Sequence, residues 1–308
     1  MRQIALEAVR LWRGEPDSLR QVSDSANHVF SFAASGQPLF LRLTSGGDRT
    51  LEQIEAELDF INHLHRGRVG VSLPVPSANG RGVETIQLGD ACLFACVFEE
   101  AVGDCFTFGS DDANRQHFRL RGQTLGRIHA LARSYAPVAG KRRFRWEEDD
   151  LFCNIESYLP QSEETVWAEH SRLMAWLSYY PQDSDTFGLI HGDFGPTNFR
   201  NRNGALTVFD FDDCCYHWFA YDLAVTIYPH GWRKEAKALM EALFEGYSEE
   251  VGSGVHLRNE LAQFCSLRQL YMFLNYAKRW GFTNLSDRQA SWFAQKRDNI
   301  ARGYMLPA

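Results

Sequence analysis

The stretch Leu189–Phe199, which reads LIHGDFGPTNF, places Asp193 two residues after His191 and five residues before Asn198. A few residues later, the run TVFDFDD carries Asp210 where an apolar segment ends. Transfer of a phosphoryl group needs a residue that accepts the proton of the acceptor hydroxyl and oxygen ligands for a divalent cation. A carboxylate, an amide and a second carboxylate at these spacings suit that chemistry.

Each residue type has a chemical reason to be present. Asp193 suits the base because the loose transition state of phosphoryl transfer requires only a weak one. The amide oxygen of Asn198 and the carboxylate of Asp210 suit Mg²⁺, which prefers oxygen ligands. His191 is expected to organise the loop that aims Asp193. A surface turn rich in Gly, Pro, Asp and Asn is the plain alternative, and the joint spacing of the motif argues against it.

Four segments together resemble the aminoglycoside phosphotransferase and choline kinase superfamily, whose fold is similar to that of protein kinases. They are His191–Asn198, Asp210–Asp213, the run Phe219–Ala224 and the run Leu125–Leu131. The resemblance implies an α+β, two-lobed fold with a small β-rich N-terminal lobe and a large helical C-terminal lobe. It also implies Asp193 as catalytic base, His191 as its loop partner, Asn198, Asp210 and Asp212 at the metal, and Asp222 as a brace of the catalytic loop.

The resemblance further implies ATP, with GTP as the alternative nucleotide, and Mg²⁺ as cofactors. The nucleotide-covering lobe is expected to span residues 1–102 and the helical lobe residues 103–308, with a hinge near 98–103. Strand patterns at 21–32 and 37–43 predict a hairpin and a third strand. The turn at 23–27 is expected to lay backbone N–H groups over the phosphates, with Ser25 and Asn27 as candidate contacts.

Arg42 stands where a kinase fold places the lysine that holds the nucleotide phosphates, and its guanidinium can bind phosphate through several donors. The segment Leu51–Leu64 has apolar residues at helical spacing, and Glu57 borders that apolar face. Glu57 is therefore the expected ion-pair partner of Arg42. The apolar strand at 90–98 runs into the hinge, where Glu99 and Ala101 are the candidate backbone contacts for the nucleotide base.

Composition agrees with an enzyme that has a large core. The chain has 308 residues, of which 44% are hydrophobic. A formal charge of −7 argues against general nucleic-acid binding. The sequence has no apolar run long enough to predict a membrane span, and its first residues do not have the pattern of a secretory signal. A cytoplasmic location is therefore expected. The seven cysteines show no metal spacing or disulfide pattern, and reduced thiols are expected. The sequence sets no oligomeric state.

The predicted partner is a small molecule that carries the acceptor hydroxyl, with an amine as a further expected feature. Two segments could face it: the acidic run Trp146–Asp150 and the aromatic-rich helix Arg268–Trp280. A solvated helix start and ordinary core packing are the alternatives for these two segments.

The remaining helical pattern is expected at 117–134, 151–158, 164–180, 222–227, 233–250, 257–280 and 287–304.

Three other functions stay open on the sequence. A protein Ser/Thr kinase of the same fold is one, although the activation segment of protein kinases is missing. A nucleotide-binding pseudokinase is the second, because of Arg42 and the unusual turn at 23–27. A metal-dependent hydrolase built on His191, Asp193, Asp210 and Asp212, with His217 and His230 as further ligands, is the third.

Overall fold

The computed structural model describes residues 1–24, 27–252 and 255–306, and these form two compact units. The N-terminal unit comprises Met1–Phe106, Ser134–Arg143 and Thr197–Asp212. The helical unit comprises Thr107–Arg133, Phe144–Pro196 and Asp213–Ala308. The expected lobes, 1–102 and 103–308, remain a prediction, and the compact units differ from them at two inserted segments. One of these, Thr197–Asp212, joins the N-terminal unit through strand-like pairing of Asp104 with Asn201 and of Val71 with Val208.

The N-terminal unit is built on a six-stranded sheet with the order β1-β2-β3-β6-β4, in which β5 also pairs with β6. All the pairings are antiparallel. The strands are β1 (Glu15–Asp24), β2 (His28–Ala34), β3 (Gln37–Ser45), β4 (Pro74–Val75), β5 (Glu84–Leu88) and β6 (Ala91–Glu99). The expected hairpin and third strand are therefore present, while β5 was not predicted.

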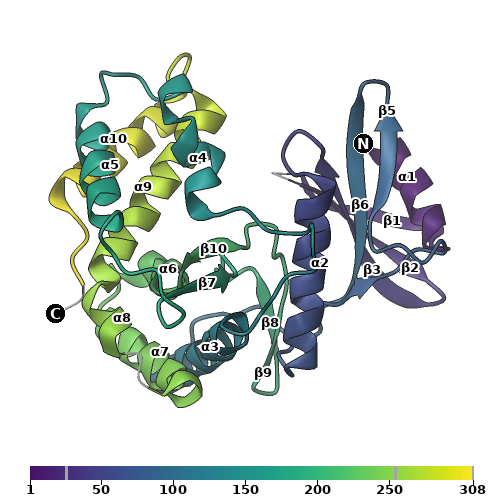
Figure 1. Cartoon of the computed structure of the whole chain (residues 1–308), viewed down its shortest axis with the longest axis horizontal. Helices are drawn as coiled ribbons and strands as arrows, with labels where there is room; N and C mark the ends of the chain where they lie inside the picture. Colours follow the sequence, from purple (N-terminus) through teal and green to yellow (C-terminus); the bar gives the residue numbers. More distant parts are fainter. Residues whose placement is uncertain (25–26, 253–254, 307–308) are drawn as a thin grey trace. The chain divides into compact units, whose positions relative to one another are not determined.

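Two helices cover opposite faces of this sheet (Figure 1). Helix α1 (Arg2–Leu11) buries Ala5, Ala8 and Val9 against apolar residues of β2 and β3. Helix α2 (Leu51–Arg66) lies on the other face, toward which Arg42 of β3 points. Thr50 begins α2 with a capping box, since its hydroxyl accepts from the Gln53 N–H and the Gln53 side chain accepts from the Thr50 N–H.

A second, small sheet completes the N-terminal unit. It is the hairpin of β8 (Phe199–Arg202) and β9 (Ala205–Val208). The apolar segment that leads to Asp210 forms a strand only as far as Val208. Asp210 lies outside it with a φ of +63°.

The helical unit contains one short two-stranded sheet and most of the helices. The strands are β7 (Phe187–Ile190) and β10 (Cys215–Trp218), which pair antiparallel. The helices are α3 (Asp111–Ala132), α4 (Asp150–Cys153), α5 (Glu164–Leu177), α6 (Phe219–Ile227), α7 (Ala236–Val251), α8 (Val255–Asn259), α9 (Leu261–Trp280) and α10 (Asp287–Arg302), and the 3-10 turns are η1 (Trp146–Glu148), η2 (Ile155–Ser157) and η3 (Tyr228–His230). The expected mixture of a β-rich N-terminal part and a helical C-terminal part is confirmed.

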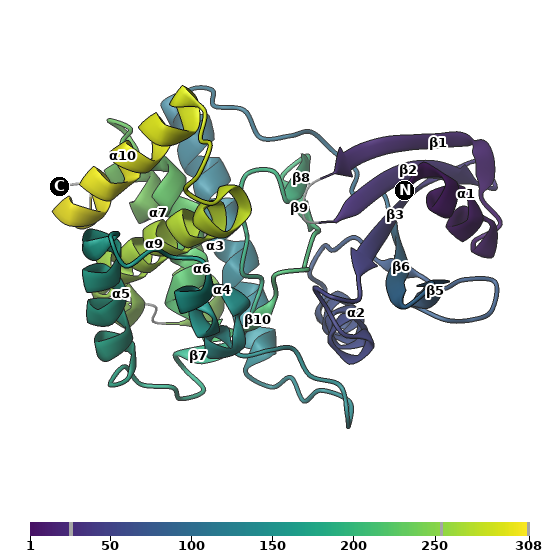
Figure 2. The same ribbon diagram turned by 90° about the horizontal axis from the view of Figure 1, so that it is seen from above.

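Close packing of α3 along α7 depends on glycine (Figure 2). A Cβ added at Gly122 would lie 2.0 Å from the Leu243 carbonyl oxygen, and one at Gly246 would lie 1.9 Å from that of Arg119. Glycine therefore lets the two backbones approach more closely than any side chain would allow.

Two predicted helices are divided in the structure. The segment at 151–158 is not one helix, because α4 ends at Cys153 and a separate 3-10 turn follows. The helix predicted from residue 257 divides into α8 and α9. Helix α1 was not predicted at all. Among the described residues, no helix is both long and apolar enough to cross a membrane.

Candidate active site

The loop that carries Asp193 lies in the helical unit, directly after β7. Gly192 has a φ of +83°, and a Cβ at this position would lie 2.3 Å from the carbonyl oxygen of Asp213. Only glycine fits this conformation and this close approach without strain. The chain bends at this glycine, two residues after β7 ends at Ile190.

Asp222 of α6 braces this loop, as the resemblance implied. Its carboxylate is fully buried and accepts from the backbone N–H groups of His191 and Gly192, both at 2.8 Å. It also lies 3.1 Å from the His129 ring nitrogen Nε2, on α3. Burial alone would raise the pKa of Asp222, but these hydrogen bonds and the nearby histidines leave the pKa below its usual value.

His191 serves the loop itself. Its ring is buried, its Nδ1 accepts from the Asp193 N–H at 3.2 Å, and it packs edge-on against Phe194. The carbonyl oxygen of Phe194 is held in turn by Arg121 at 2.9 Å and Thr226 at 3.3 Å. His191 thus holds the backbone at Asp193, while Arg121 and Thr226 hold the residue that follows it. The catalytic role of His191 stays a prediction.

Asp193 meets a residue that the sequence interpretation did not single out. Its Oδ1 accepts from Arg268 Nη2 of α9 at 2.6 Å. The Arg268 side chain is only 13% exposed, whereas that of Asp193 is 34% exposed. The aromatic residues around Arg268 were noticed in the sequence, but no local pattern connects this arginine with a residue 75 positions earlier.

A small pocket of the helical unit, here called the aromatic–acidic pocket, lies beside Gly192. Its principal lining residues are the aromatic side chains of Trp146, Phe152, Tyr221 and Tyr271, with Asp149 and Asp213. The pocket unites parts of the two segments considered for acceptor binding, since Trp146 and Asp149 come from the acidic run and Tyr271 from α9. Trp146 is buried, and its Nε1 has no hydrogen-bond partner in the part of the chain that the structure describes.

The other members of those two segments have structural contacts. Glu147 pairs with Arg145, and Asp150 pairs with Lys278. On α9, Tyr276 and Trp280 pack against Trp292 of α10. Solvated charge and core packing therefore account for these residues.

The candidate metal ligands Asn198 and Asp210 lie in the N-terminal unit, at the two ends of the β8–β9 hairpin. The Phe209 N–H donates to the Asn198 carbonyl oxygen at 3.0 Å, so the hairpin backbone brings the two ligand-bearing segments side by side. Asp210 is exposed and has a left-handed backbone, which is uncommon for a residue other than glycine. Such strain often accompanies functional positions. An amide and a carboxylate oxygen fit a hard cation, and the metal-binding roles remain a prediction.

The predicted ion pair between Arg42 and Glu57 forms. Arg42 donates to both carboxylate oxygens of Glu57, at 2.8 and 2.7 Å, and both side chains are buried. Burial disfavours the charged guanidinium, but Glu57 and Asp212 outweigh that effect and raise the pKa of Arg42 well above its usual value. The arginine is therefore fixed in position and permanently charged.

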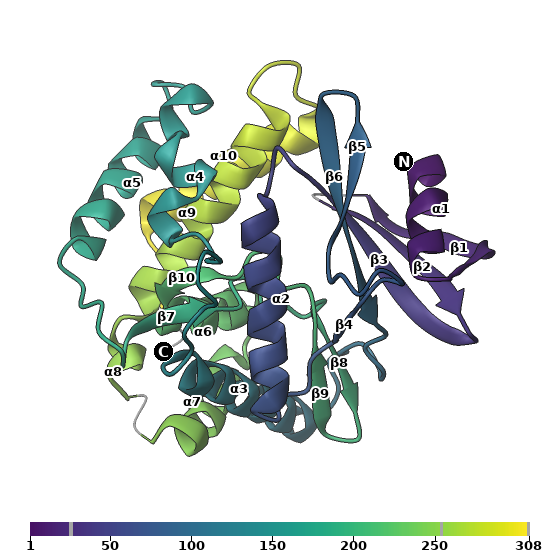
Figure 3. The ribbon, with the colours of Figure 1, turned by 45° about the vertical axis from the view of Figure 1, so that its right-hand side comes forward.

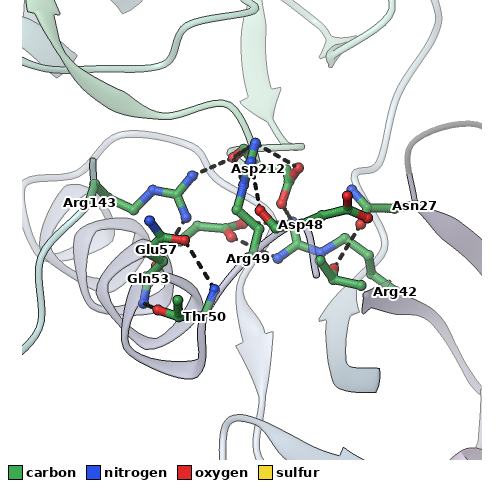
Figure 4. Close-up of polar contacts among 10 residues, drawn as sticks. Asn27, Arg42, Asp48, Arg49, Thr50, Gln53, Glu57, Arg143 and Asp212 are labelled. Carbon is green, nitrogen blue, oxygen red and sulfur yellow. Dashed lines mark hydrogen bonds and ion pairs between the residues drawn. The ribbon is translucent and has the colours of Figure 1, made fainter. Parts of the chain in front are cut away.

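Asp212 lies among arginines (Figure 4). Its carboxylate is 3.4 Å from Arg49 and 3.9 Å from Arg42, while Arg143 donates to its backbone oxygen. Burial would raise the pKa of Asp212, but the neighbouring arginines lower it. We call Arg42, Arg49, Arg143, Glu57 and Asp212 the arginine cluster. Three guanidinium groups and two carboxylates give this cluster a net positive charge. A metal-binding role of Asp212 stays a prediction.

The remaining nucleotide-binding candidates are placed less tightly. Asn27 accepts from the Thr44 hydroxyl at 2.8 Å and lies beside the arginine cluster (Figure 4). Ser25 lies outside the described residues. At the predicted hinge, the Glu99 N–H donates to the Leu73 carbonyl oxygen at 2.8 Å, and the Glu99 carbonyl oxygen accepts from the Ser72 hydroxyl. Ala101 follows β6 and is partly exposed. Contact of Glu99 and Ala101 with a nucleotide remains a prediction.

The histidines proposed for a hydrolase lie in aromatic surroundings. His217 stacks on Tyr221, and His230 packs against Phe108 and Phe118. Burial lowers the pKa of His217 to about 3 and that of His230 to about 4. Among the described residues, no group of three or more His, Cys, Asp or Glu side chains could hold a metal ion. None of the seven cysteines is paired in a disulfide in the described part of the chain.

The fold drawn in Figure 3 is shared by solved structures. The amicoumacin kinase hAmiN, in complex with AMP-PNP, Ca²⁺ and Ami, has a TM-score of 0.90 and 26% identity, and the match covers 97% of this chain and 92% of that chain. A hygromycin B complex of the aminoglycoside phosphotransferase APH(4)-Ia has a TM-score of 0.63 and 18% identity, over 98% of both chains. The second likeness shows the fold alone.

Sequence comparison gives the same relationship. The chain is 27% identical to the amicoumacin kinase of Bacillus subtilis (strain 168), over 99% of this chain and 94% of that protein. The model of the phosphotransferase enzyme family matches residues 18–257, which include the predicted catalytic loop and the three predicted metal ligands. The chain therefore belongs to the phosphotransferase enzyme family, and it is a kinase of the small-molecule type.

Proposed function

We propose that the protein transfers the γ-phosphoryl group of ATP, with Mg²⁺, to a hydroxyl of a small acceptor that carries an amine. The observation that carries the proposal is the position of the aromatic–acidic pocket beside Gly192, next to the base Asp193. The relative hAmiN was solved with an ATP analogue and a divalent cation, which supports the same classes of ligand here.

The reaction needs little covalent chemistry from the protein. The acceptor oxygen forms a bond to the γ-phosphorus as the bond from that phosphorus to the bridging oxygen of ADP breaks. The hydroxyl proton passes to the Asp193 carboxylate and then to solvent. The loop contacts of Asp222 and His191 supply the positioning, because they fix the backbone that carries the carboxylate.

The N-terminal unit suits the nucleotide. A net positive arginine cluster attracts phosphate oxygens, and Glu57 holds the Arg42 guanidinium in one orientation before any ligand arrives. Asn198 and Asp210 would hold Mg²⁺ when it is bound, where it would neutralise and orient the phosphates. Ala101, Glu99 and Asn27 are the further predicted contacts.

The aromatic–acidic pocket suits an ammonium group. Carboxylates of Asp149 and Asp213 lie close enough to Tyr271 to raise its pKa, after the larger effect of burial. Aromatic faces attract cations, and desolvated carboxylates do so more strongly.

The test is acceptor-dependent formation of ADP by the purified protein, measured with Mg²⁺ across amino alcohols, amino sugars, nucleosides, plain sugars and a generic protein substrate. We expect turnover with amine-bearing alcohols and loss of at least about 100-fold in Asp193→Ala. Asp298→Ala is the matched control, because this acid is exposed on α10 and has no role in the proposed site.

Three outcomes would overturn the proposal in different ways. Transfer only to a protein would favour the protein kinase alternative. Saturable nucleotide binding without transfer to any acceptor would favour the pseudokinase. Equal turnover of amine-bearing and plain alcohols would keep the kinase but remove the amine from its acceptor class.

A further inference from the structure

We infer that Arg268 is a positioning residue of the reaction, which holds the catalytic carboxylate of Asp193 in one orientation from the buried helix α9. The inference rests on the proposed function, because it assigns Asp193 the role of base. It concerns a residue beyond position 257, where the match to the family ends.

The first support is the geometry of the contact. One Arg268 nitrogen, Nη2, lies 2.6 Å from Asp193 Oδ1, which is a short charge-assisted hydrogen bond. Both residues belong to the helical unit. Asp193 is the more exposed partner, and a carboxylate at a loop tip would otherwise rotate among several orientations. The arginine selects one of them.

The second support is that Arg268 is itself held. Its guanidinium carbon lies 5.3 Å from the centre of the Tyr271 ring, and the Tyr221 hydroxyl is a hydrogen-bond partner. Burial disfavours the charge, but Tyr221, Asp193 and Tyr271 together raise the pKa of Arg268 above its usual value. The residue on which Asp193 depends is therefore rigid and permanently cationic.

The third support is the energetic asymmetry of a largely buried charge. An arginine that is only 13% exposed carries a desolvation cost, which a purely structural position could avoid with an apolar side chain. Because Arg268 contacts the base rather than a remote acid, we attribute this cost to the positioning of Asp193. The acceptor hydroxyl approaches the Asp193 carboxylate along a fixed direction, and small errors in such an alignment lower rates strongly.

The experiment compares Arg268→Gln with Arg279→Gln, a change on the same helix at an exposed arginine. We expect Arg268→Gln to lower kcat by about 100-fold with little change in the KM for ATP. Arg268→Ala should regain activity when guanidinium ion is added at low concentration, and the control should not respond.

Two further variants keep the test decisive if Arg268→Gln folds poorly. Tyr221→Phe removes only the hydroxyl that supports Arg268, and we expect a smaller loss of kcat, about 5-fold to 10-fold. In an Asp193→Asn background, Arg268→Gln should cause no additional loss, because residues that act as a unit are not additive.

The outcomes separate this inference from the proposed function. Absence of acceptor-dependent transfer by the unaltered protein would refute the proposed function. Normal transfer by the unaltered protein together with normal kcat in Arg268→Gln, or a full additional loss in the Asp193→Asn background, would refute only the role of Arg268.

Discussion

Replacement of the loop brace, Asp222→Asn, should weaken both the fold and catalysis. In the native protein, Oδ1 of Asp222 accepts from the Gly192 N–H, while Oδ2 accepts from the His191 N–H and contacts His129. Asparagine has the same shape, but its amide nitrogen cannot accept. Whichever oxygen is replaced, at least one backbone N–H of the loop faces another donor.

The cost follows from burial. Asp222, His191 and His129 are fully buried, so the orphaned N–H cannot turn to water. An unsatisfied buried donor costs about 1–3 kcal/mol, and loss of a charged acceptor adds a similar amount. We expect a destabilisation of about 3 kcal/mol, which is also the lower end for breaking a buried charged pair. The loop should shift, and kcat should fall by about 100-fold because Asp193 loses its alignment.

The assay is urea unfolding followed by tryptophan fluorescence, with kcat measured on the same samples. For an m-value of about 3 kcal/mol/M, the midpoint should fall by about 1 M. Asp298→Asn, an exposed acid on α10, should leave both quantities unchanged. A native midpoint in Asp222→Asn, or a lowered midpoint with full kcat, would refute the account of Asp222 as the brace of a catalytic loop.

Three other outcomes follow from single positions. Gly192→Ala should lose more than about 10-fold in kcat, because the new Cβ meets a backbone oxygen and the φ is unfavourable, and a normal rate would contradict this. Glu57→Gln, compared with the exposed Glu52→Gln, should cost about 3 kcal/mol in urea unfolding and raise the KM for ATP, because Arg42 loses its bidentate partner. Stability should also fall as the pH drops from about 6.5 toward 4, since the pKa of the buried His217 is lowered to about 3 and the unfolded chain takes up protons that the folded chain excludes. Each such histidine changes the free energy of unfolding by up to about 1.4 kcal/mol per pH unit. The difference between the urea midpoints at pH 7.5 and pH 5 should therefore be smaller in His217→Gln than in the unaltered protein, and an equal difference would refute the assignment.

The parts of the site that could be predicted from the sequence are those coded by short spacings. His191, Asp193 and Asn198 lie on one loop, and the Arg42–Glu57 pair follows from a strand and the next helix. Helical periodicity also identified α2, because its apolar face repeats regularly.

Long-range partners could not be predicted in this way. Arg143 and Arg49 meet Asp212 only after the chain has folded back, and Arg268 reaches Asp193 across 75 residues. No local period marks such contacts. Helix α1 is a different case, because Ala5, Ala8, Val9 and Trp12 recur on one face at helical spacing, so its local pattern could have been recognised in the sequence.

That first helix has a practical consequence for anyone who trims the chain. The match to the family begins at residue 18, after α1 has ended. Yet Ala5, Ala8 and Val9 are completely shielded from solvent, and the Trp12 indole N–H donates to the Val75 carbonyl oxygen at 2.7 Å. A fragment cut at the family boundary would leave Leu19, Phe30 and the apolar side of β3 open to water, and an uncovered sheet of this kind tends to aggregate. A boundary taken from the family match would thus remove α1, the helix that covers this face of the sheet.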